Sequence, residues 1–367
     1  MKLSKLFIVA TTFFGLLFFP SAAFAKAKIQ IAILLDSSNS MDGLIDQTRM
    51  QLWEIVNALT TVTKDGEAPE LEVALYHYGN DRLPSEEGFL RQLNRFTPEL
   101  DLVSEKLFGI DTLGGQEYAG WVVKSAMTEL NWSADEADFR VIFIAGNESF
   151  DQGPIDWQTS INLALEQDTI VNTIYCGSSE AEERELWAAG ARVGAGTSFN
   201  INQNRNISFI ESPYDEEIAL WNQRLNETYI PYGSEGLLGQ ERQQAEDVNS
   251  REQLATRSAS KVSIYYRNIS WDLVDALDEG IVNLEDFTPD DLPEIMQGMT
   301  LEQRREYVAT QREERVRIQQ IIRELTEKRA VYVARERQVN PTPEDTLHFV
   351  TIRALQEQLA EKGFQLN

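Results

Sequence analysis

Five consecutive residues, Asp36-Ser37-Ser38-Asn39-Ser40, carry the clearest chemical pattern in the sequence. One carboxylate and two hydroxyl groups alternate along a short segment, so Asp36, Ser38 and Ser40 can converge on one point. Oxygen ligands of this kind suit a hard divalent cation such as Mg²⁺, and also Mn²⁺ or Ca²⁺. Asp and Ser also favour turns and capping positions, so the pattern by itself leaves a metal site and a structural loop open.

Other residue types that support catalysis or metal binding are scarce. The chain has one cysteine, Cys176, and two histidines, His77 and His348, that lie far apart in the sequence. An internal disulfide is therefore impossible, and a zinc site built from cysteine or several histidines is not expected. No G-x-S-x-G elbow or P-loop occurs in the sequence. His77 and Cys176 both fall in strand-like runs, and we expect them to be structural.

The sequence around the Asp-Ser pattern alternates strand-like and helix-like segments. Apolar runs predict strands at residues 29–35, 72–78, 139–145, 169–176 and 198–201. Apolar residues at three- and four-residue spacing predict helices at residues 46–62, 118–130, 155–165 and 180–191. This alternation predicts an α/β fold with a mainly parallel, doubly wound sheet. Ligands of such sheets sit beyond the carboxyl ends of the strands, which is where residues 36–40 stand.

This combination resembles the von Willebrand factor type A (VWA) family, whose metal-ion-dependent adhesion site begins with a D-x-S-x-S motif after the first strand. The apolar run at residues 29–35 and the following Met41 fit that family. The segment Leu-Gly-Gly-Gln-Glu-Tyr at residues 113–118 opens a helix where the family places its second metal loop. Residues 188–199 resemble the family's closing Gly-rich turn and last strand. The resemblance covers residues 28–203 and implies a protein-binding domain.

Two positions depart from the family's pattern. The family usually has Thr after the Gly-Gly pair, whereas this chain has Gln116, whose carbonyl oxygen can ligate a hard metal directly or through water. The family's third loop usually has Asp where this chain has Gly146. The resemblance implies an open coordination position that accepts a carboxylate from a protein partner. The implied metal ligands are Asp36, Ser38, Ser40 and Gln116, with Thr112, Asn147 and Glu148 as further candidates.

The first residues have the pattern of an export signal. Lys2 and Lys5 precede a mostly apolar stretch at residues 6–19, and the cleavage signal Ala-Phe-Ala follows at residues 23–25. We expect residues 1–25 to be removed and the mature chain to be exported to a periplasm or the extracellular medium. The apolar stretch is shorter than the roughly 18–20 residues of a spanning helix, and no later stretch is longer. A membrane span is therefore not expected in the mature chain.

The charge of the chain argues against nucleic acid as a partner. The sequence has 59 acidic and 33 basic residues and a formal net charge of −26, whereas phosphate recognition needs Lys and Arg. A hydrophobic content of 42% is enough for a buried core. The acidic excess is absent from residues 300–338, which hold ten Lys or Arg and seven Glu.

The part of the chain after residue 205 is predicted to be all helical. Helices are expected at residues 214–229, 240–257, 262–277, 300–337 and 344–362. Thr300 and Gln303 form a capping-box pattern before the long charged helix, and Gly363 ends the last one. The long helix has a thin, interrupted heptad-like stripe. Packing against the chain itself, self-association as a coiled coil and docking to an acidic partner therefore all stay open. We divide the chain into a signal peptide (1–25), a VWA-like domain (26–205), a helical linker region (206–298) and a charged long helix with a terminal amphipathic helix (299–367).

Together these features predict an exported, non-enzymatic adhesion or scaffold protein that binds another protein through a VWA domain, assisted by a divalent metal. One alternative is a metal-independent envelope scaffold or assembly factor, with a degenerate metal site and contacts made by the C-terminal helices. A further alternative is a metal-dependent hydrolase in which Glu117 or Glu148 acts as a base.

Overall fold

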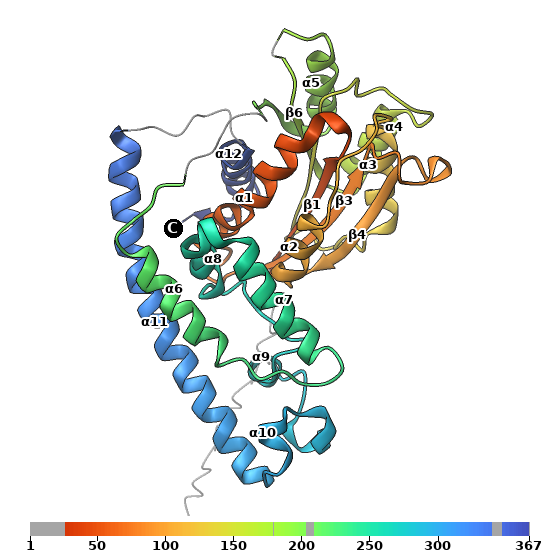
Figure 1. The fold of residues 1–367 in the computed structure, drawn as a ribbon. Coiled ribbons are helices and arrows are strands. Elements are labelled where there is room, and N and C mark those ends of the chain that lie inside the picture. The colour runs from red at the N-terminus through yellow and green to blue at the C-terminus, as the bar shows by residue number, and fades with distance from the viewer. Residues whose placement is uncertain (1–25, 179, 203–208, 340–346, 367) are drawn as a thin grey trace, which may run out of the picture.

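Figure 1 shows the fold of the protein in a computed structural model that describes residues 26–178, 180–202, 209–339 and 347–366. The predicted export signal at residues 1–25 lies outside the described residues. No helix in the described ranges is both long enough and apolar enough to cross a membrane.

A six-stranded sheet forms the centre of the first part of the chain. Its strands lie in the order β4 (Leu90–Thr97), β3 (Glu70–Tyr78), β1 (Lys28–Asp36), β5 (Phe139–Gly146), β6 (Ile170–Tyr175) and β7 (Ala195–Asn200). Every neighbouring pair is parallel except β3 and β4, which run antiparallel. The chain starts in the middle of the sheet and winds outward in both directions, which is the doubly wound order. The predicted α/β fold class is therefore confirmed.

Helices cover both faces of this sheet because its central strands are apolar on both sides. One face packs on α1 (Asp42–Leu59), α2 (Leu100–Phe108) and α12 (Leu347–Glu361). The other face packs on α3 (Ala119–Glu129), α4 (Trp157–Glu166) and α5 (Glu183–Val193). Along β1, Ile29 and Ile31 point to the first layer whereas Ala32 and Leu34 point to the second, which is the alternation of an extended strand. Because all strands except β4 run parallel, their carboxyl ends and the loops that follow lie at one edge of the sheet.

Strand β4 and helix α2 were not predicted from the sequence. They occupy the stretch between the predicted strand at 72–78 and the predicted helix at 118–130. Strand β4 has one neighbour in the sheet, and Arg91 and Arg95 on it are exposed. Charged residues commonly protect an edge strand from pairing with other chains. They also interrupt the apolar run by which a central strand is recognised, so the sequence signal of β4 is weak.

The second part of the chain is helical, as predicted, but its boundaries differ. It contains α6 (Asp215–Asn226), α7 (Gly236–Asn249), α8 (Leu254–Lys261), α9 (Leu273–Asp278), α10 (Glu294–Gln297) and α11 (Leu301–Val339). The predicted helix at 240–257 is divided near Ser250, whose hydroxyl accepts a hydrogen bond from Trp53 Nε1 at 3.0 Å. The predicted helix at 262–277 is wrong over most of its length, because only α9 is helical there. Upstream of α9, Tyr265 and Tyr266 instead donate to Leu59 O and the Asp101 carboxylate of the α/β region.

The long helix α11 begins and packs for identifiable reasons. The predicted capping box is confirmed, since Thr300 N donates to Gln303 Oε1 at 2.9 Å and Gln303 N donates to Thr300 Oγ1 at 3.3 Å. Arg315, which interrupts the apolar stripe, is buried and pairs with Asp272 at 2.7 Å and Asp275 at 2.9 Å. The interruption of the stripe is therefore a buried ion pair that joins α11 to α9.

The end of the chain returns to the α/β region. Helix α12 packs beside α1, and its Gln358 exchanges hydrogen bonds of 2.7 and 2.9 Å with Asn172 of β6. After Gly363, strand β8 (Gln365–Leu366) pairs antiparallel with β2 (Val62–Thr63). The predicted unit 299–367 is therefore divided: α11 lies with the helical region, whereas α12 completes one layer of the sheet.

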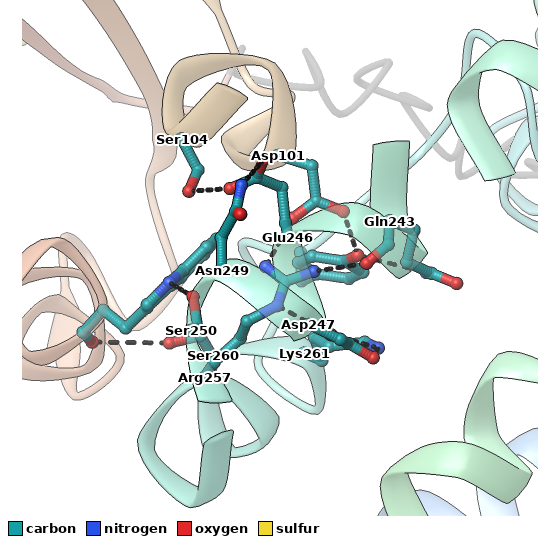
Figure 2. Close-up of polar contacts among 12 residues, drawn as sticks. Asp101, Ser104, Gln243, Glu246, Asp247, Asn249, Ser250, Arg257, Ser260 and Lys261 are labelled. Atoms are coloured by element: carbon teal, nitrogen blue, oxygen red, sulfur yellow. Dashed lines mark hydrogen bonds and ion pairs between the residues drawn. The ribbon is translucent and has the colours of Figure 1, made fainter. Parts of the chain in front are cut away.

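A buried polar network joins the helical region to the α/β region (Figure 2). Arg257 of α8 is fully buried and pairs with Asp101 of α2 at 2.6 Å and Asp247 of α7 at 2.7 Å. Lys261 approaches the same Asp247 carboxylate at 3.2 Å, and burial lowers the pKa of this lysine to about 8. Separating the two regions would leave the buried Asp101 carboxylate without Arg257, so the network favours a single rigid body.

Candidate metal centre

Asp36, the last residue of β1, is the most buried side chain of the candidate site. Its Oδ1 accepts a hydrogen bond from Ser38 N at 2.7 Å. Its Oδ2 is also buried and has no hydrogen-bond donor among the described residues. A buried carboxylate oxygen without a partner costs free energy. A cation or a proton at this position would remove that cost.

A row of polar groups leads from Asp36 to the surface. The hydroxyls of Ser38 and Ser40 lie 3.0 Å apart, and Ser40 Oγ donates to Asn147 Oδ1 at 3.0 Å. Ser38 is buried whereas Ser40 is exposed. The structure therefore brings together the three predicted ligands of the first loop and Asn147 from the loop after β5.

The second carboxylate of the site is Glu117, which is buried just before α3. Its place beside Asp36 depends on Gly79, where a Cβ would lie 2.7 Å from Asp36 Oδ1 and 2.8 Å from Glu117 Cγ. Glu148 N donates to Glu117 Oε2 at 3.3 Å. Burial raises the pKa of both carboxyl groups, and the nearby charge of Glu117 raises the pKa of Asp36 further. Two adjacent carboxyl groups favour a shared cation or a shared proton, because either one removes their repulsion.

The remaining predicted ligands contact other groups. Gln116 is exposed, and its Oε1 accepts a hydrogen bond from the Tyr118 hydroxyl at 3.3 Å. The Thr112 hydroxyl donates to the carboxylate of Asp42 in the first turn of α1. The Glu148 side chain is exposed. These three residues border the site. Glu117, which follows Gln116 in the second loop, points its carboxylate toward Asp36 instead. The sequence pattern predicts Glu117 only as a possible base, and its place beside Asp36 depends on tertiary contacts.

The structure also explains why position 146 carries no carboxylate. A Cβ on Gly146 would lie 2.6 Å from the Tyr78 hydroxyl and 3.0 Å from the Trp187 ring. Both side chains are held in place, because Tyr78 donates to Ala145 O at 3.1 Å and Trp187 Nε1 donates to Glu148 O at 2.8 Å. Two aromatic side chains thus occupy the volume that an Asp at this position would need. The second carboxyl group of the site comes from Glu117 instead.

The donor set fits a hard cation better than a soft one. Among the residues that the structure describes, no group of three or more His, Cys, Asp or Glu side chains is placed to hold a metal ion. The candidate site offers two carboxylates together with hydroxyl and amide oxygens. Mg²⁺, Mn²⁺ and Ca²⁺ take such oxygen sets and complete them with water or ligand oxygens. The residues present therefore fit the cation that the sequence pattern predicted.

Comparison with known proteins finds similarity only among solved structures, since no family model and no curated protein matches. Proximal thread matrix protein 1 from the mussel byssus is 11% identical with a TM-score of 0.35, covering 48% of this chain and 42% of that one. An aerotolerance-related membrane protein from Bacteroides fragilis is 17% identical with a TM-score of 0.31, covering 48% and 93%. The SpRpn10 VWA domain is 16% identical with a TM-score of 0.33, covering 48% and 88%. This chain thus spans less than half of the mussel protein. Its doubly wound α/β fold follows from the strand order described above.

Proposed function

We propose that this chain is an exported, non-enzymatic protein that captures a protein ligand through a divalent cation at the carboxyl edge of its VWA-like sheet. The observation that carries the proposal is the buried pair Asp36 and Glu117, in which Asp36 Oδ2 has no donor in the described part of the chain. The residues that would hold the cation are Asp36, Glu117, Ser38, Ser40 and Asn147. The bound cation would supply positive charge for a partner's carboxylate. Export rests on the pattern of residues 1–25.

The electrostatics of this edge support a role for a cation in binding a partner carboxylate. Three exposed acidic residues, Asp42, Asp81 and Glu148, follow the strands β1, β3 and β5. A partner carboxylate that approaches this edge meets like charges, which repel it unless a cation intervenes. The row from Ser38 to Ser40 opens toward solvent and marks the side from which the partner oxygen would enter.

Calorimetric titration of the chain without residues 1–25 tests the cation with Mg²⁺, Mn²⁺ and Ca²⁺ in turn. We expect saturable binding of at least one of them by the unaltered chain. Binding should be lost in Asp36→Ala and weakened about tenfold or more in Glu117→Gln, because each removes one of two buried carboxylates. Glu87→Gln removes an exposed carboxylate outside the site and is the matched control. The absence of both binding heat and a melting shift with all three cations would overturn the metal-assisted function.

Tyr78 and Trp187 fill the space beside Gly146, so the site lacks the carboxylate of the family's third loop. This absence favours a second candidate function. If Asp36 and Glu117 share a proton rather than a cation, the protein is a metal-independent scaffold whose helical region makes the contacts. Deleting the C-terminal half would not separate the two candidates, because α12 and α8 are part of the packing around α1. Affinity capture from an envelope extract with and without a chelator does so. A partner that Asp36→Ala still captures in the presence of chelator supports the scaffold. A partner that the unaltered chain captures only without chelator, and that Asp36→Ala does not capture, supports the cation.

A further inference from the structure

Phe89, Tyr118 and Trp121 form an aromatic cluster beside the candidate metal centre. The Phe89 and Tyr118 rings meet edge to face with centroids 5.7 Å apart. The Tyr118 and Trp121 rings lie nearly parallel, at 9°, with centroids 6.3 Å apart. All three side chains are half-buried. Trp121 packs against the α3 layer of the sheet, whereas Phe89 and Tyr118 belong to none of the apolar clusters of the described residues. The aromatic cluster therefore presents ring surface that the core does not use.

The aromatic cluster and the metal centre share their loops. Tyr118 directly follows Glu117 in the chain. The Phe89 carbonyl accepts a hydrogen bond from Gly79 N at 2.9 Å. Gly79 is also the position where a Cβ would lie within 3 Å of the Asp36 and Glu117 side chains. Neighbouring residues of one protein ligand can therefore reach both the metal centre and the rings.

Phe89 is held in a backbone conformation that is uncommon for a residue with a bulky side chain. Its φ is +52°, in the left-handed region, and Gly88 before it has a φ of +78°. Phe89 N donates to Pro84 O at 3.1 Å, and Gly79 holds its carbonyl group. Residues in such conformations cost free energy and cluster at binding sites. The strained residue presents its ring to Tyr118 at the surface, where a ligand can use it.

Acidic residues predominate around the aromatic cluster. Glu86 and Glu87 are exposed just before Gly88, which lies against the Trp121 ring. Asp151 is exposed in the loop after β5, which also contacts the cluster. Three segments border the rings and together hold seven acidic and three basic residues: 81–91, 116–124 and 148–156.

The three basic residues of these segments leave the rings uncovered. Arg82 already pairs with Asp111 at 3.3 Å. Arg91 lies opposite His77 on the neighbouring strand and shares its face of the sheet, which is the face away from α3. Lys124 is exposed on α3. None of the cation–π pairs among the described residues involves a ring of the aromatic cluster.

Another half-buried ring of this chain shows the contrast. Trp221 has two arginines of the chain over its ring, Arg224 at 4.7 Å and Arg317 at 5.4 Å from the centroid. An arginine on an aromatic face is therefore a contact that this chain makes within itself. At the aromatic cluster the rings and the acidic surroundings are present, and the cation has to come from a ligand.

We propose that the aromatic cluster binds an arginine side chain of the same protein ligand whose carboxylate binds the cation. A guanidinium group is planar and stacks on aromatic faces, and the acidic residues add attraction. The inference rests on the proposed function for the carboxylate and adds a second residue by which the ligand is recognised. The arginine also offsets the repulsion that a lone carboxylate meets at this acidic edge.

Synthetic peptides test the proposal with the chain lacking residues 1–25. Each probe is a fluorescein-labelled peptide in which an arginine and an aspartate are separated by two, three or four glycines. The comparison peptides carry citrulline, which has the shape of arginine without its charge. With Mg²⁺, Mn²⁺ and Ca²⁺ all present, fluorescence anisotropy should show saturable binding of at least one Arg peptide and about fivefold or more weaker binding of its citrulline counterpart. Equal affinities at every spacing, or no saturable binding of any Arg peptide, overturn the proposal.

A chelator separates this inference from the proposed function. Binding of both kinds of peptide should weaken in chelator, because both lose the cation that holds their carboxylate. Equal binding of the two kinds, lost in chelator, would support the cation and overturn the arginine site. A preference for arginine with an affinity that chelator does not change would support the arginine site and overturn the cation-dependent capture.

Two substitutions at Tyr118 locate the arginine site. Tyr118→Leu removes the aromatic face and should lower the affinity of the Arg peptide to that of the citrulline peptide. It should change the affinity of the citrulline peptide less than about twofold, since that peptide gains little from the ring. Tyr118→Phe keeps the ring and should retain the preference for arginine. Equal weakening of both peptides by Tyr118→Leu, or the same loss in Tyr118→Phe, overturns the site.

Discussion

Gly79 and Gly146 decide which carboxylates reach the candidate site. The absent side chain at Gly79 leaves room for Asp36 and Glu117 to meet, since a Cβ there would lie within 3 Å of both side chains. At Gly146 the situation is reversed, because Tyr78 and Trp187 already fill the space. The site therefore has two carboxylates, but the second comes from the loop before α3 rather than from the loop after β5.

Restoring the family's carboxylate with Gly146→Asp should harm the protein rather than strengthen metal binding. The new side chain would overlap the Tyr78 hydroxyl and the Trp187 ring, and overpacking of this kind costs about 1–3 kcal/mol. Urea unfolding measures this cost. Adding Tyr78→Phe should recover part of the loss, because it removes the nearest atom. A Gly146→Asp variant of unchanged stability and tighter metal binding would contradict this account of the loop.

His77 makes the stability depend on pH. It lies 8% exposed behind the first loop, with Nδ1 2.9 Å from Ser37 Oγ and Nε2 buried without a partner among the described residues. Burial, and then the charge of Arg91, lower its pKa from 6.5 to about 4. The unfolded chain therefore binds this proton more readily between these values, so the free energy of unfolding falls as the pH drops from 6.5 to about 4. The loss is up to about 3 kcal/mol.

The variant His77→Gln isolates this contribution from the many carboxylates that titrate in the same range. Urea unfolding of both proteins at several pH values gives the difference between their free energies of unfolding. Since only the unaltered chain loses the histidine contribution, the difference should shrink as the pH falls through the window. A difference that stays constant from pH 7 to pH 4 would show that His77 does not titrate in this way.

At the scale of the elements, the strongest local patterns formed as predicted and tertiary contacts changed the rest. Strands β1 and β5 follow continuous apolar runs, and α11 starts at its capping box. The division between α7 and α8 coincides with the hydrogen bond from Trp53 to Ser250, which comes from 197 residues away. The segment before α9 likewise sends two tyrosine hydroxyls into the α/β region. Hydrogen-bond partners that are this distant in the sequence cannot be predicted from the neighbouring residues.

Helix α11 depends on the buried ion pair of Arg315. Arg315→Met would leave Asp272, which is fully buried, and Asp275 without their cation, and loss of one partner of a buried pair costs about 3–5 kcal/mol. Arg317→Met is the matched control, since Arg317 is exposed and pairs with Glu314 one turn away. It should cost no more than about 0.5 kcal/mol. Urea unfolding compares the two, and equal costs would rule out the buried pair as the anchor of α11.

At the scale of the whole molecule, we expect the α/β and helical regions to unfold as one cooperative unit, because the network around Arg257 joins them. Asp101, the partner of Arg257 in α2, is 3% exposed, and the Tyr266 hydroxyl also donates to it. The return of α12 and β8 to the sheet adds a second connection. The two regions are therefore linked twice, by the buried network around Arg257 and by the return of α12 and β8 to the sheet.

Arg257→Met tests this unity. It should cost about 3–5 kcal/mol because Asp101 and Asp247 lose a buried partner. Hydrogen exchange should show similar opening free energies for α3 and α6 in the unaltered chain, and a lower value for α6 in the variant. Arg242→Met breaks a more exposed ion pair between α7 and α2, with Glu105, and is the control. Unequal protection of α3 and α6 in the unaltered chain would contradict a single unit.

Three features can be predicted from the sequence alone: the α/β alternation, the position of the Asp36-Ser38-Ser40 motif at the end of β1 and the cap of the long helix. These features depend on consecutive residues, whose periodicity and hydrogen-bonding groups are visible in the sequence. Four others become visible only in the folded chain: Glu117 lies beside Asp36, aromatic rings fill the space at position 146, Arg315 has acidic partners, and α12 packs on the sheet. Each of these depends on which distant side chains share a small volume, and packing rather than local pattern determines that.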